Sequence, residues 1–175
     1  ARKDMVGKIV EKLASGEIPT KVTHNDTKLN NVLIDDATGK ALCVIDLDTI
    51  MPGTVCYDFG DSIRFGCNPA AEDEKDLTKV NFDINLFEQY VKGYVSTLKA
   101  TLTQAEADNL ALGAIMMTYE CGIRFLSDYL DGDVYFRVKR PEHNLDRTRT
   151  QFKLVADMEK NLDKMNAIVA KYYKG

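Results

Sequence analysis

The sequence lacks several features that mark familiar classes of protein. It has no tryptophan, and its four cysteines are scattered without a C-x-x-C pair. We therefore expect reduced, mostly buried thiols of a cytoplasmic protein, not a disulfide framework or a zinc site. No apolar run approaches the roughly 18 residues that span a bilayer, and no secretory leader is seen. The formal net charge is −4, whereas a nucleic-acid-binding protein usually shows a basic excess. Neither a membrane nor a nucleic acid is expected as a partner.

The chain does have the apolar content of a folded protein. Of its 175 residues, 45% are hydrophobic, which is enough for a real core. This length fits one domain or one lobe of a larger protein. No internal repeat or interdomain linker divides it, so residues 1–175 are expected to form one unit.

Hydrophobic periodicity predicts that most of this unit is helical. Helical spacing covers residues 2–14, 58–65, a segment from Asp83, a segment from Thr103 and a last helix across 155–172. Thr103 and Glu106 form a capping box that opens the fourth helix. The face of that helix expected to be apolar consists of Leu112, Ile115, Tyr119, Ile123, Leu126 and Leu130. Residues 72–76 are expected to form a solvated loop and residues 131–147 an irregular segment.

A small amount of β structure is expected near the N-terminus. Two apolar runs rich in β-branched residues, 32–34 and 41–45, flank a turn that contains Gly39 and predict a β-hairpin. A short strand is expected at residues 21–23. The predicted fold class is therefore mainly α with a small β-hairpin, that is, α+β.

The polar loop at residues 24–31 (HNDTKLNN) contains the first chemical motif. His24, Asp26 and Asn31 follow H-x-D-x-x-x-x-N, the spacing of kinase catalytic loops. Phosphoryl transfer needs a carboxylate that orients and deprotonates the attacking hydroxyl, and cations that neutralise phosphate oxygens. Asp26 suits the first task. Asn31 suits the second, because its side-chain carbonyl is a hard oxygen ligand for magnesium.

A second acidic position makes the signal stronger. Asp46 lies fifteen positions after Asn31, at the end of the second strand of the hairpin. A carboxylate beside the catalytic loop can hold a Mg²⁺ that bridges the phosphates of ATP, the expected co-substrate. Asp46 is the better candidate ligand, and Asp48 is either a second ligand or a residue that braces the loop.

Other polar residues near the motif have two interpretations each. For His24, holding the loop through a backbone hydrogen bond is favoured over proton transfer. Asp58 is expected to cap the helix at 58–65 or to brace the catalytic loop. Lys28 either helps to neutralise the γ-phosphate of ATP or is simply solvated.

Three blocks together resemble a known superfamily. They are HNDTKLNN at 24–31, VIDLDT at 44–49 and YDFGD at 57–61. They resemble the aminoglycoside phosphotransferase and choline kinase superfamily, whose fold is like that of protein kinases. Within it, the first two blocks look most like those of the N-acetylhexosamine 1-kinases.

The resemblance implies a role for each matched residue. Asp26 would be the catalytic base, and Asn31 and Asp46 would be the magnesium ligands. Arg124 and Tyr135 lie where the N-acetylhexosamine 1-kinases are expected to contact the sugar.

One part of a complete kinase is not found. Such an enzyme needs an N-terminal lobe with a loop that covers the nucleotide and a phosphate-binding lysine on a strand. No Gly-rich loop or strand-rich segment precedes His24, and the chain begins at Ala1 without an initiator methionine. We therefore expect residues 1–175 to be the C-terminal lobe, with the N-terminal lobe of the same protein as its missing partner. Alone, this lobe is expected to bind ATP poorly and to be nearly inactive.

The charge of the segment 131–149 bears on the acceptor. The segment contains five basic residues (Arg137, Lys139, Arg140, Arg147 and Arg149) and four acidic ones (Asp131, Asp133, Glu142 and Asp146). A polycationic aminoglycoside would prefer an acidic wall, and choline would prefer an aromatic cage with tryptophan. A neutral sugar fits better, unless these arginines are simply a solvated surface. The alternatives are a kinase for choline, an aminoglycoside or homoserine, and a catalytically silent lobe that binds a ligand or partner.

Overall fold

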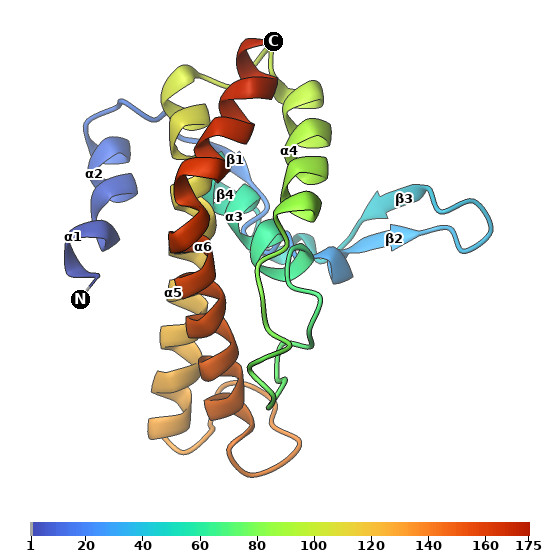
Figure 1. Ribbon diagram of the computed structural model, residues 1–175, viewed down its shortest axis with the longest axis vertical. Helices are drawn as coiled ribbons and strands as arrows, with labels where there is room; N and C mark the ends of the chain where they lie inside the picture. Colours follow the sequence, from blue (N-terminus) through green and yellow to red (C-terminus); the bar gives the residue numbers. More distant parts are fainter. Residues whose placement is uncertain (1) are drawn as a thin grey trace.

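The computed structural model describes residues 2–175. The chain folds into an α+β unit that is mostly helical, as expected, and that is consistent with the C-terminal lobe of a kinase-like fold (Figure 1). In chain order its elements are α1 (Lys3–Val6), α2 (Lys8–Ala14), β1 (Lys21–Thr23), η1 (Leu29–Asn31), β2 (Val32–Ile34), β3 (Ala41–Val44), η2 (Leu47–Thr49), β4 (Met51–Gly53), α3 (Val55–Gly66), α4 (Ile84–Leu98), α5 (Gln104–Leu130) and α6 (His143–Lys174).

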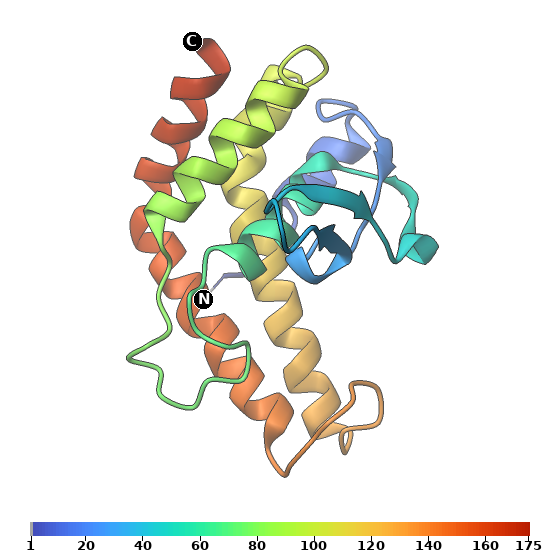
Figure 2. The same ribbon diagram turned by 90° about the vertical axis from the view of Figure 1, so that its right-hand side faces the viewer.

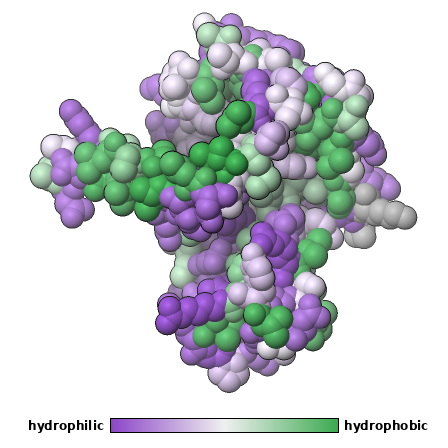
Figure 3. All heavy atoms as spheres, turned by 180° about the vertical axis from the view of Figure 1, so that it is seen from behind, coloured by the Kyte–Doolittle hydropathy of each residue, from purple (hydrophilic) through white to green (hydrophobic). Residues whose placement is uncertain are grey.

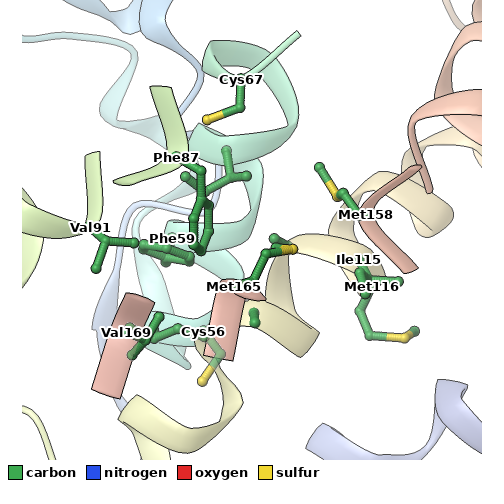
Figure 4. Close-up of a cluster of buried hydrophobic side chains, with 14 of the residues drawn as sticks. Cys56, Phe59, Cys67, Phe87, Val91, Ile115, Met116, Met158, Met165 and Val169 are labelled. Carbon is green, nitrogen blue, oxygen red and sulfur yellow. The ribbon is translucent and has the colours of Figure 1, made fainter. Parts of the chain in front are cut away.

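The two long helices α5 and α6 run antiparallel and form the body of the fold (Figure 1). Helix α4 packs beside α6, and α3 packs against α5. Figure 4 shows the core between them, with Phe59 of α3, Phe87 of α4, Ile115 of α5 and Met165 of α6. All four side chains are fully buried, and each contributes roughly 1.5–3 kcal/mol to stability through removal from water.

Two glycines let α3 and α5 approach until their backbones touch. A Cβ atom on Gly60 would lie under 3.0 Å from the carbonyl oxygen of Gly113, and one on Gly113 would lie equally close to that of Cys56. Real Cβ atoms essentially never come so near a neighbour. The close packing fixes α3, which borders the catalytic-loop motif, against the long helix α5.

The strands lie on one side of the helices (Figure 2). The predicted hairpin is confirmed, since β2 and β3 pair antiparallel with Val32 opposite Val44. The predicted strand at 21–23 is also confirmed, but its partner β4 was not expected. Pro52 lies within β4, which a two-stranded edge tolerates because one side of it makes no ladder bonds.

The hairpin projects from the body and exposes apolar side chains. In Figure 3 it forms a continuous hydrophobic arm. The exposed residues on the two strands include Leu33, Ile34, Leu42 and Val44.

Helix ends agree with the sequence in most places. The capping box is confirmed, with Thr103 and Glu106 bonding reciprocally, and Asp83 caps α4. Helix α3 starts at Val55, because the Thr54 side chain accepts a hydrogen bond from the backbone N–H of Cys56. Asp58 therefore lies in the first turn and does not cap the helix.

Three helix predictions need correction. The first helix is divided at Gly7 into α1 and α2. The last helix begins at His143, well before the predicted start at 155. The irregular segment predicted at 131–147 is therefore shorter than expected. On α5, Ile123 and Leu130 are exposed, because the buried face is set by contacts with both α3 and α6 and follows Leu110, Ala111, Ala114 and Thr118 instead.

The cysteines are all free. Cys56 and Cys67 are buried and Cys121 is partly buried, as expected for most of the thiols, whereas Cys43 is exposed on the hairpin. Among residues 2–175, no helix combines the length and apolarity that a membrane span requires.

Candidate active site

The loop at residues 24–31 is anchored by one carboxylate from α3. Asp58 Oδ2 accepts a hydrogen bond from the backbone N–H of His24 (2.8 Å), and Oδ1 accepts one from that of Asn25 (2.7 Å). Asn25 has a left-handed backbone (φ 64°), and its side-chain amide donates to the carbonyl oxygen of Thr49 (3.0 Å). Asp58 thus lies where it braces the loop, the second of the two roles considered for it.

Replacing Asp58 with asparagine should loosen this anchor. The Asp58→Asn variant presents an amide donor to one of two backbone N–H donors, so we expect the free energy of unfolding to fall by about 2 kcal/mol. Urea unfolding measures the change. Asp36→Asn is the matched control, since Asp36 is exposed on the turn of the hairpin. Equal midpoints for the two variants would show that Asp58 does not brace the loop.

His24 joins the loop to the segment that carries Asp46. Its Nδ1 accepts a hydrogen bond from the backbone N–H of Asp26 (3.3 Å), and its Nε2 lies 3.0 Å from the carbonyl oxygen of Ile45. A carbonyl oxygen can only accept, so Nε2 is the donor in this contact. Both ring nitrogens contact backbone groups, as the predicted role of holding the loop requires.

Asp26 lies at the centre of a small cluster of donors. Its Oδ2 accepts hydrogen bonds from Lys28 Nζ (2.7 Å) and Asn31 Nδ2 (2.9 Å). Burial raises the pKa of Asp26, but the hydrogen bonds from Lys28 and Asn31 and the charge of Lys28 outweigh it and lower the pKa below its ordinary value of 3.8. The carboxylate is therefore ionised at neutral pH and can accept a hydrogen bond from an alcohol.

Asn31 and Asp46 are neighbours across the base of the hairpin. The backbone N–H of Ile45 donates to the carbonyl oxygen of Asn31 (2.9 Å), and Asp46 follows Ile45 directly. Asn31 is only 5% exposed, and its Nδ2 is used by Asp26. Asp46 is exposed and is held in the left-handed region (φ 64°), a conformation that non-glycine residues adopt at an energetic cost.

These two residues fit a magnesium ion by their chemistry. Magnesium takes oxygen ligands and commonly binds one or two carboxylates together with phosphate oxygens of a substrate. Within residues 2–175, no three His, Cys, Asp or Glu side chains gather closely enough to form a metal site by themselves. An ion here would thus need the amide oxygen of Asn31 and nucleotide phosphates as well as Asp46. Asp48 is exposed in η2, two residues further on.

A cavity of about 400 Å³ is lined by residues of the loop at 24–31 and of the hairpin. Its wall is mainly apolar and includes Val32 and Val44 of the hairpin, Cys67 after α3 and Tyr90 of α4.

The predicted acceptor residues share a second cavity with Asp26. This cavity has a volume of about 500 Å³ and is lined by Asp26 and Lys28 of the loop and by Arg124 and Tyr135. The Arg124 guanidinium lies 5.7 Å from the ring centre of Tyr135 and 5.4 Å from that of Phe136. Tyr135 itself is 72% exposed. The structure thus brings together residues that are about a hundred positions apart in the sequence.

An ion-pair network at the same cavity was missed by the sequence analysis. Arg64 Nε donates to Asp61 Oδ1 (2.9 Å), and Arg64 Nη1 donates to Glu72 Oε1 (2.7 Å). Arg147 lies near the other oxygen of Glu72, with its Nε 3.7 Å away. Glu72 is therefore not part of a purely solvated loop. The spacing of Asp61 and Arg64, three residues apart on one helix, was the available signal.

The anchored loop, the adjacent carboxylate and the shared cavity define a phosphotransferase of the kinase-like type. Residues 8–97 match the model of the phosphotransferase enzyme family (APH), and this match covers just over half of the chain. The protein belongs to this phosphotransferase family. The matched segment contains the catalytic loop, Asp46 and α3, whereas Arg124 and Tyr135 lie outside it.

Proposed function

We propose that this chain is the C-terminal lobe of an ATP- and Mg²⁺-dependent kinase that phosphorylates a neutral sugar. The favoured acceptor is an N-acetylhexosamine, phosphorylated on its 1-hydroxyl. The N-terminal lobe of the same protein would complete the nucleotide site, and the free thiols suit a cytoplasmic location. The observation that carries the proposal is the single cavity lined by Asp26, Arg124 and Tyr135.

Each residue of the loop has a part in this reaction. Asp26 orients the acceptor hydroxyl and takes its proton while the oxygen attacks the γ-phosphorus of ATP, and the bond from that phosphorus to the bridging oxygen breaks so that ADP leaves. Asn31 and Asp46 would hold Mg²⁺, which neutralises charge on the phosphate oxygens, and Asp48 could supply a further oxygen ligand. Lys28, which pairs with Asp26 here, can turn to the γ-phosphate when nucleotide binds.

The balance of charges in the cavity favours a neutral acceptor. Five basic residues (Lys28, Arg64, Arg124, Arg137 and Arg147) line it together with four acidic ones (Asp26, Asp61, Glu72 and Glu120). A polycationic aminoglycoside would meet like charges there, and these are costly. The guanidinium of Arg124 already lies over the two aromatic rings at the mouth, so these rings do not form a free cage for choline.

A substrate panel tests the proposal. The full-length protein is given ATP and Mg²⁺ with N-acetylhexosamines, aminoglycosides, choline or homoserine, and ATP consumption is followed. We expect the highest kcat/KM with an N-acetylhexosamine and a product whose phosphorus NMR signal is that of a sugar 1-phosphate. Chelation of the divalent ion should abolish turnover, and added Mg²⁺ should restore it. A higher kcat/KM with choline, homoserine or an aminoglycoside would overturn the sugar assignment, and silence across the panel would favour a binding lobe.

A further inference from the structure

We propose that Asp61 recognises a hydroxyl of the acceptor and determines which sugars enter the site. The inference rests on the proposed function and deepens it, since it assigns a binding role to Asp61, which ends the third matched block (57–61) but received no role from the resemblance.

The first observation is an unused hydrogen-bond acceptor. Asp61 is only 6% exposed, and its Oδ1 accepts a hydrogen bond from Arg64 Nε. Its Oδ2 is buried and has no hydrogen-bond partner within the described part of the chain. Buried polar atoms are nearly always paired, so an unpaired oxygen on a carboxylate that lines a cavity suggests a donor that arrives with the ligand.

The second observation is the position of Asp61. It lines the same cavity as Asp26. It also lies one turn after Asp58, the residue of α3 that holds the loop through the backbone of His24 and Asn25. One short helix therefore positions the proposed base and presents Asp61 to the same space.

A complementary donor lines this cavity too. Arg147 Nε is buried and has no hydrogen-bond partner among the described residues, since its ion-pair partner Glu72 lies 3.7 Å away. Four such side-chain atoms occur among the described residues, and the other two, on Glu106 and Gln151, do not line the cavity. An unpaired acceptor and an unpaired donor together suit a neutral ligand that carries both hydroxyl hydrogens and oxygen acceptors.

The charge balance around Asp61 indicates which chemical group of the ligand pairs with it. Arg64 is buried and pairs with both Asp61 and Glu72, and Arg147 lies near Glu72 as well, so two guanidinium groups balance these two carboxylates. The charge of Asp61 is therefore balanced without a cation from the substrate. Its missing partner is an uncharged hydrogen-bond donor. A sugar hydroxyl fits this requirement, whereas the ammonium groups of an aminoglycoside do not.

The test uses Asp61→Asn in the full-length protein. The amide can keep an oxygen toward Arg64, but it replaces the unpaired acceptor with an N–H donor. We expect KM for the sugar to rise about 10- to 100-fold, the usual effect of losing a hydrogen bond to a charged group. The changes in kcat and in KM for ATP should stay within about threefold, because an interaction made equally in the ground and transition states affects mainly KM.

Deoxy sugars separate recognition from a structural role. Wild-type protein should use one monodeoxy analogue about 10- to 100-fold less well than the parent sugar. In Asp61→Asn that penalty should disappear, so that the analogue and the parent are used equally. A residue that only braces Arg64 would leave the penalty intact.

Glu106→Gln is the matched control. Glu106 is also buried, paired with a basic residue (Lys21, 2.8 Å) and left with one unpaired oxygen, but it does not line the cavity. Thermal unfolding of both variants records their stability, and Glu106→Gln should leave KM for the sugar unchanged. An unchanged KM in Asp61→Asn, or a preserved deoxy penalty, would overturn the role of Asp61 while the sugar kinase stands. A wild-type protein that neither phosphorylates nor binds sugars would reject the proposed function and this inference together.

Discussion

The Asp26→Asn variant of the full-length protein is expected to lose turnover by about 10²- to 10⁴-fold, the usual contribution of a general base. Asparagine has the same shape and can keep the hydrogen bond to the acceptor hydroxyl, but it cannot take the proton. The affinity for nucleotide should stay nearly intact, because the phosphates are held by other groups. ATP consumption with the preferred acceptor and equilibrium nucleotide binding measure the two effects.

The control for this variant is again Asp36→Asn, on the exposed turn of the hairpin. It should keep full activity. Normal turnover in Asp26→Asn would remove Asp26 from the role of base.

The same residue predicts a simple pH dependence. Because the pKa of Asp26 lies below 3.8, its carboxylate stays ionised as the pH falls from 7 to about 5. Any fall in kcat over that range should therefore come from another group. The kcat profile of wild type and that of the residual activity of Asp26→Asn should have the same shape. The low pKa also means that the ionised form adds stability above the ordinary pKa, and that this stability is lost only as the pH falls through the folded-state value.

Gly113→Ala should destabilise the protein strongly. Alanine in the middle of a helix normally stabilises by about 0.5–1 kcal/mol relative to glycine. At Gly113 the sign should reverse, because the new methyl group would collide with the backbone carbonyl of Cys56 on α3. Overpacking of this kind costs typically 1–3 kcal/mol and sometimes more, so we expect a loss of about 3 kcal/mol. Denaturant unfolding measures it.

Gly93→Ala provides the opposite result on the same chain. Gly93 lies inside α4, and an added Cβ would meet nothing within 4 Å. This variant should be more stable than wild type by about 0.5–1 kcal/mol. If alanine raises stability equally at both positions, the backbones of α3 and α5 are not in close contact.

The sequence by itself determined the local features of this protein. The capping box at Thr103 and Glu106 and the hairpin at 32–45 were both predicted and are both present. The loop also brings the side chains of Asp26 and Asn31 together, as their spacing indicated. Each depends on residues within about fifteen positions, where capping, turn chemistry and side-chain alternation act directly on the nearby backbone. The fold class followed from the same local patterns.

Only the tertiary structure decided features that join distant segments. The pairing of β1 with β4 and the anchoring of His24 and Asn25 by Asp58 link residues that are far apart in sequence. The buried face of α5 was predicted wrongly for Ile123 and Leu130, because a helix that packs on two neighbours has no single apolar stripe.

The cavity is the clearest case of this division. The motif indicated Asp26, and the family resemblance suggested Arg124 and Tyr135, but no local pattern could show that Asp61 and Arg147 line the same space. Whether a polar atom is buried without a partner depends on every segment that packs around it, and that is set only when α3, α5 and the loop after α5 come together. The phosphotransferase family was thus readable from short motifs, whereas the cavity that joins Asp26, Asp61 and Arg147 exists only in the folded chain.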